Sequence, residues 1–130
     1  MELWHIGRKE LLALEEKSFQ GKQLNFSINK ELLESKHVVV FEGKIQAVDW
    51  EHELRVVYPP FFPDKPPIVI DKTGIYKRHQ NPRTGNLCLP VWHRKMTGAD
   101  KVLEAITYIN RYIEDPDSLK EDEADAGEPL

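Results

Sequence analysis

The sequence predicts an α+β domain in which a small antiparallel sheet packs against two helices. Three observations predict this class. A helical period of apolar residues comes first, four strand-like segments follow it, and a second helical period begins near residue 100. The 130 residues correspond to one domain. Their composition, 40% apolar and 31% charged, is typical of a soluble globular protein.

The first helix is predicted over residues 6–19. Its apolar positions lie among charged residues, as on one buried helical face, and are Leu11, Leu12, Leu14 and Phe19. Gly21 is expected to end the helix.

Four strands are predicted next, from a period of two or from short apolar runs. They cover residues 24–28, 38–41, 50–58 and 68–70. Gly43 is expected to mark a bulge or a turn after the second strand. The short spacings allow each strand to pair with the next one, so a four-stranded antiparallel meander is expected.

Two irregular segments are predicted around the fourth strand. Residues 58–67 contain five prolines, which remove backbone donors and restrict φ, so a stiff loop held by its aromatic side chains is expected. Residues 71–96 show no sustained period and predict a long coil. Its apolar residues, among them Leu87, Leu89, Val91 and Trp92, indicate that this coil is packed, and long packed coils are usually functional.

The second helix is predicted to begin after Thr97, with this residue as its N-cap and Asp100 at its third position. Its apolar stripe comprises Val102, Ile106, Ile109 and Ile113. Asp115 and Pro116 are expected to end it.

Charge separates a domain, residues 1–116, from an acidic tail, residues 117–130. Residues 114–130 hold eight acidic residues and one lysine, a net charge of −7, so the other residues carry +3 of the total of −4. The tail is expected to be flexible and to act as a solubilising segment, or else as a docking or self-shielding one. The sequence has no large basic stripe, so a nucleic-acid partner is not expected. The sequence shows neither an apolar run long enough to span a membrane nor the features of a secretion signal, so a cytoplasmic location is expected.

The candidate catalytic residue is Cys88, the single cysteine of the chain. A lone cysteine is most often a small buried apolar residue. Here His79 and Asn81 precede it, and neighbouring basic residues favour its thiolate. A thiolate can attack an acyl carbonyl and hold the acyl group as a thioester. A nearby Asn amide can stabilise the negative charge on the carbonyl oxygen. A cysteine hydrolase, with His79 as its base, stays open.

Five motifs in order resemble the ubiquitin-conjugating (UBC-fold) family over about residues 6–116. The motifs are Tyr58-Pro59 with Lys65-Pro66-Pro67, Ile75-Tyr76, His79-Gln80-Asn81, Gly85-Asn86-Leu87-Cys88-Leu89, and Trp92 with Thr97 and Lys101-Val102-Leu103. The resemblance implies a UBC-like fold and thioester chemistry. By this resemblance, Cys88 is expected to accept the C-terminal carbonyl of a ubiquitin-like protein from an activating enzyme and to pass it to a lysine of a target protein.

The resemblance also assigns roles to the residues before Cys88. Asn81 is the amide that stabilises the oxyanion or orders the loop, and His79 is structural in the same turn. The family places its amide eight residues before the cysteine, whereas Asn81 lies seven before it, so Gln80 is the alternative to the preferred Asn81. The resemblance implies no metal and no organic cofactor, and the histidines show no metal-ligand spacing.

The chain is expected to lack the two C-terminal helices that are usual in the family. This shorter form resembles the bacterial conjugating enzymes of antiphage defence operons. Their conjugated protein is either a ubiquitin-like protein or a nucleotidyltransferase, joined through its C-terminus, and the sequence leaves this choice open. Two other functions are also open: a catalytically inactive UBC-fold binding module, and a cysteine hydrolase that removes such tags.

Overall fold

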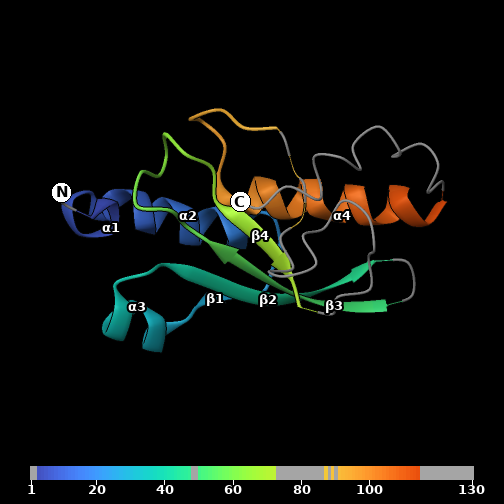
Figure 1. Ribbon diagram of the computed structural model, residues 1–130, viewed down its shortest axis with the longest axis horizontal. Helices are drawn as coiled ribbons and strands as arrows, with labels where there is room; N and C mark the ends of the chain where they lie inside the picture. The colour runs from blue at the N-terminus through green and yellow to red at the C-terminus, as the bar shows by residue number, and fades with distance from the viewer. Residues whose placement is uncertain (1–2, 48–49, 73–86, 88, 90, 115–130) are drawn as a thin grey trace.

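The computed structural model describes residues 3–47, 50–72, 87, 89 and 91–114. Its elements are α1 (Trp4–Gly7), α2 (Lys9–Gly21), β1 (Phe26–Ile28), α3 (Lys30–Lys36), β2 (Val40–Ala47), β3 (Trp50–Val57), β4 (Ile68–Asp71) and α4 (Gly98–Glu114). Helices α2 and α4 form a layer on one side of the sheet (Figure 1). The predicted α+β class is confirmed, and the predicted acidic tail, residues 117–130, lies outside the described residues.

The sheet is the predicted four-stranded antiparallel meander, with strand order β1-β2-β3-β4. The period of two in β3 sets its faces, because successive side chains of a strand point to opposite sides. Leu54 and Val56 are completely buried, whereas Glu51 and Glu53 are exposed. The inner face therefore meets the helices, and the outer face carries charged residues.

Gly43 does not mark the expected bulge or turn, because β2 continues through it. Gly43 pairs with Phe26 on one side and with Leu54 on the other. A Cβ atom at this position would lie 2.5 Å from the ring of Phe26 and 2.8 Å from the carbonyl oxygen of Asn25. Glycine is thus needed here because the Phe26 ring lies against the strand backbone, and not because the backbone turns.

The first helical region differs from its prediction in its extent and in its buried face. It begins at Trp4 and breaks at Arg8, whose φ of −131° and ψ of 69° are not helical. Leu14, expected on the buried face, has 56% of its surface exposed. Glu15 is buried in its place, since it lies four residues from both Leu11 and Phe19 and so shares their side of α2.

Helix α3 was not expected, since it lies between two strands and buries none of its residues. Its ends nevertheless carry local signals. The side chain of Asn29 caps the N-terminus by accepting a hydrogen bond from the N–H of Leu32 at 3.0 Å. His37 ends the helix in the left-handed conformation, with φ of 55°.

The core lies between the inner face of the sheet and the two long helices. Helix α4 contributes three residues of the predicted stripe: Val102 and Ile109 are buried, and Ile106 packs against the core at its edge. The side chain of the fourth, Ile113, lies outside the described part of the structure. Thr97 caps α4 as expected. Its Oγ1 accepts from the N–H of Asp100 at 3.2 Å, while the Asp100 carboxylate accepts from the N–H of Thr97 at 2.8 Å.

The Pro-rich segment, residues 58–67, is held by aromatic rings, as predicted. The ring of Phe62 lies with its centroid 4.7 Å from that of Trp4 and 4.9 Å from that of Tyr58. Phe61, by contrast, is exposed. The peptide bond between Phe62 and Pro63 is cis. Within the described part of the chain, no helix is long and apolar enough to cross a membrane.

Candidate functional site

The predicted catalytic residues, Cys88, Asn81 and His79, lie outside the described residues, as does the alternative amide Gln80. The structure does describe Leu87 and Leu89, the neighbours of Cys88 in the sequence. The contacts of these two neighbours show which elements of the fold hold the backbone before and after the cysteine.

Leu87 is attached to the outer edge of the sheet. Its N–H donates to the carbonyl of Val69 in β4 at 2.8 Å, and its side chain is buried in the core. The expected packing of this coil holds in part further along. Leu89 and Trp92 pack against the core and are half-buried, but Val91 is 56% exposed. The indole N–H of Trp92 donates to the carbonyl of Pro63 at 3.1 Å, which joins this segment to the Pro-rich loop.

Lys101 attaches Leu89 to α4. Its side chain is 1% exposed, and its Nζ donates at 2.7 Å to each of three oxygens. The acceptors are the backbone carbonyls of Leu89 and Val91 and the carboxylate of Glu104. A buried ammonium is tolerated when its charge is paired and its three donors are satisfied, and both conditions hold here. The backbone that follows Cys88 in the sequence is thereby held to the first turns of α4.

A second buried polar pair joins β3 to β4. His52 and Asp71 have fully buried side chains, and Nδ1 of His52 lies 3.1 Å from Oδ2 of Asp71. Its Nε2 lies 3.3 Å from the carbonyl oxygen of Ala47. Both ring nitrogens thus lie beside oxygen atoms, so this buried ring has polar partners on both sides. The pair thereby links β3 to the end of β4.

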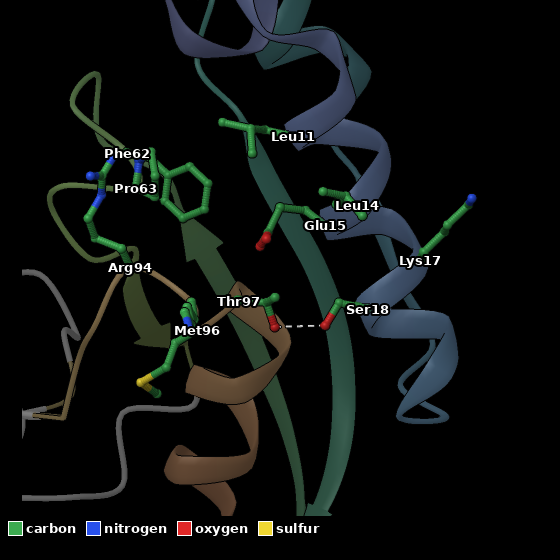
Figure 2. A pocket seen from close by; sticks show the side chains of 11 residues that line it. Leu11, Leu14, Glu15, Lys17, Ser18, Phe62, Pro63, Arg94, Met96 and Thr97 are labelled. Atoms are coloured by element: carbon green, nitrogen blue, oxygen red, sulfur yellow. Dashed lines mark hydrogen bonds between the residues drawn. The ribbon is translucent and has the colours of Figure 1, made fainter.

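A cleft of about 570 Å³ opens between α2, the Pro-rich loop and residues 94–97 (Figure 2). Its lining combines apolar and cationic side chains with three polar ones: Leu11, Leu14, Glu15, Lys17, Ser18, Phe62, Pro63, Arg94, Lys95, Met96 and Thr97. Ser18 and Thr97 share a hydrogen bond of 2.7 Å, which joins the two walls at one end, as Figure 2 shows.

Glu15 lies in the wall of this cleft and connects three parts of the fold. Its Oε1 accepts from the hydroxyl of Tyr58 at 2.5 Å and from the N–H of Gly98 at 2.7 Å. Burial raises the pKa of the Glu15 carboxyl, and these two hydrogen bonds oppose the rise. Burial, together with the Glu15 carboxylate, also raises the pKa of Tyr58 well above its usual value. A Cβ atom at Gly98 would collide with the Tyr58 hydroxyl, so this contact requires glycine.

Sequence reasoning did not assign roles to Glu15, Lys101 or the His52–Asp71 pair. One signal was present for Glu15, because its spacing from Leu11 and Phe19 places it on the buried face. Lys101 was identified as part of a motif, but a motif does not reveal which carbonyls a lysine contacts. Among the described residues, no group of three or more His, Cys, Asp or Glu side chains is arranged to hold a metal ion.

No protein-family model matches this sequence, and no curated protein sequence is significantly similar to it. The resemblance to the ubiquitin-conjugating family, and the roles it implies for Cys88, Asn81 and His79, therefore stay predictions.

Proposed function

We propose that the protein is a ubiquitin-conjugating-like acyl carrier that uses Cys88 as its nucleophile. It takes the C-terminal carbonyl of a ubiquitin-like protein, or of a nucleotidyltransferase, as a thioester and transfers it to a lysine of a target protein. The setting we propose is bacterial antiphage defence in the cytoplasm, with an activating enzyme as the donor.

The observation that carries the proposal is the attachment of the backbone on both sides of Cys88. Leu87 is bonded to β4, and Leu89 is bonded to the buried Lys101 on α4. A nucleophile needs a fixed position relative to the groups that assist it, because misplacement by 1 Å can cost about a hundredfold in rate. The described order also supports a UBC-like fold, with helices α1 and α2 first, then the antiparallel strands with the Pro-rich loop between β3 and β4, and then α4.

The proposed reaction has two acyl transfers. In the first, the Cys88 thiolate attacks the acyl carbonyl held as a thioester on the activating enzyme. A new carbon–sulfur bond forms, and the thiolate of the activating enzyme leaves. In the second, the lysine amine attacks the Cys88 thioester, a carbon–nitrogen bond forms, and the Cys88 thiolate leaves while the amine loses a proton to water.

Asn81, with Gln80 as the alternative, donates its amide N–H to the carbonyl oxygen while that oxygen carries negative charge. Removal of one such donor typically slows an acyl transfer by about 10² to 10³. Asn81→Ala is therefore expected to load with its tag at the parent rate and to discharge to lysine at least about 100-fold more slowly. Gln80→Ala is the matched control. Slow discharge in Gln80→Ala, with Asn81→Ala unaffected, would move the role to Gln80.

The decisive experiment incubates the protein with ATP, a candidate activating enzyme and its ubiquitin-like protein or nucleotidyltransferase. Non-reducing gels are expected to show an adduct that a thiol reagent removes and that Cys88→Ala does not form. No adduct with partners that are active on another carrier would refute the proposal and favour a binding module. Net release of a tag from an isopeptide-linked substrate would favour the hydrolase.

A further inference from the structure

The cleft between α2, the Pro-rich loop and residues 94–97 has an apolar floor and an excess of positive charge at its edge. Leu11, Phe62 and Pro63 face one another across the space between α2 and the loop, as Figure 2 shows. The cationic lining residues are Lys17, Arg94 and Lys95, and the one acidic lining residue is Glu15. Glu15 is buried and bonded inward, so its charge is not presented at the cleft edge.

The cations of the cleft are available to an incoming acid. Lys95 is exposed and makes no ion pair with any described acidic residue, whereas the Lys17 side chain points away from the cleft in Figure 2. Arg94 pairs with Asp64 at 2.9 Å, but these side chains are 68% and 67% exposed. An ion pair so exposed holds its partners weakly, so Arg94 can exchange Asp64 for another carboxylate. The cleft therefore suits a segment that carries several acids and an apolar side chain.

We propose that the C-terminal segment of the same chain, residues 115–130, docks in this cleft. The segment carries a net charge of −6, since it holds seven acidic residues and Lys120. Its acids are Asp115, Asp117, Glu121, Asp122, Glu123, Asp125 and Glu128. Leu119 lies among them and supplies an apolar side chain for the floor of the cleft. This proposal does not depend on the proposed acyl-carrier function.

The segment is long enough to reach the cleft. Helix α4 begins at Gly98, next to the lining residue Thr97, and its 17 residues carry the chain about 25 Å away. Sixteen further residues, fully extended, span up to about 50 Å. Because the segment is covalently attached, its effective concentration at the cleft is on the order of millimolar, so weak contacts are enough for docking.

The test uses the methyl NMR signals of methionine in the full chain. The chain has two methionines, Met1 and Met96, and Met96 lines the cleft. We compare the parent with a tail variant, Glu121→Gln/Asp122→Asn/Glu123→Gln/Asp125→Asn. The Met96 signal is expected to differ between the two at about 0.1 M salt. The parent signal is expected to approach that of the variant at about 1 M salt, where the Debye length falls from about 10 Å to about 3 Å.

Two controls make the result specific. Glu31→Gln/Glu34→Gln on α3, which does not line the cleft, is expected to leave the Met96 signal in place. Arg94→Glu, at the edge of the cleft beside Phe62 and Pro63, is expected to reduce by at least half the shift that the tail variant causes. Coincident Met96 signals in parent and tail variant, or a shift that Arg94→Glu leaves unchanged, would overturn the proposal. A shift that grows with protein concentration would overturn it too, because the occupant would be the tail of a second copy.

Discussion

Replacing Lys101 by methionine removes the buried ammonium that holds Leu89 and Val91 against α4 and keeps a side chain of similar size. The carbonyls of Leu89 and Val91 and the carboxylate of Glu104 then lose their shared donor. Removal of one partner from a buried ion pair typically destabilises a protein by about 3 to 5 kcal/mol, because the other charge stays without compensation. The Glu104 carboxylate is 17% exposed and regains some water, so the lower end, about 3 kcal/mol, is expected.

The assay is urea unfolding of the parent and of two matched variants. Lys72→Met is the control for the loss of a lysine, since Lys72 forms a pair with Glu53 at 3.3 Å in which both side chains are more than a third exposed. It is expected to cost less than about 1 kcal/mol. Lys101→Met/Glu104→Gln leaves no uncompensated charge and is expected to recover part of the loss. A Lys101→Met midpoint within error of the Lys72→Met midpoint would show that the three contacts do not stabilise the fold.

Two further predictions concern the contact between α2, Tyr58 and α4. Because burial raises the pKa of Glu15 in the folded state, folding favours its protonated form. Its contribution to stability is present below about pH 4.5, the ordinary pKa, and is lost as the pH rises through the raised pKa. Urea unfolding is thus expected to show that the free energy of unfolding of Glu15→Gln rises relative to that of the parent between pH 4 and pH 7. A difference between the two that stays constant, or that changes in the opposite direction, would contradict this. Gly98→Ala is expected to lower the free energy of unfolding by about 1 to 3 kcal/mol, because the new Cβ atom clashes with Tyr58. Gly21→Ala is the control, since Gly21 has open space around it, and it is expected to be neutral or slightly stabilising in thermal unfolding. Equal melting temperatures for the two alanine variants would refute the close packing at Gly98.

The elements with strong local signals were predictable from the sequence. A period of two identified two of the strands, short apolar runs identified the other two, and the short spacings predicted the meander. Thr97 and Asp100 marked the beginning of α4, because an N-cap and its third residue bond to each other within one turn. The Pro-rich loop was predictable because its prolines restrict φ and remove backbone donors locally. Cys88, Asn81 and His79 stay predictions of the sequence, on which the proposed function rests.

The sequence by itself thus determined the order of the four strands and the two long helices, and which strand faces pack inward. Both depend on neighbours a few residues apart. Tertiary structure decided which charged side chains are buried. Glu15 finds its partners at Tyr58 and Gly98, which lie 43 and 83 residues further along the chain. Likewise, the Phe26 ring explains Gly43 only after β1 and β2 pair. A buried charge is tolerated only where its donors and acceptors meet, and that meeting is a property of the folded chain.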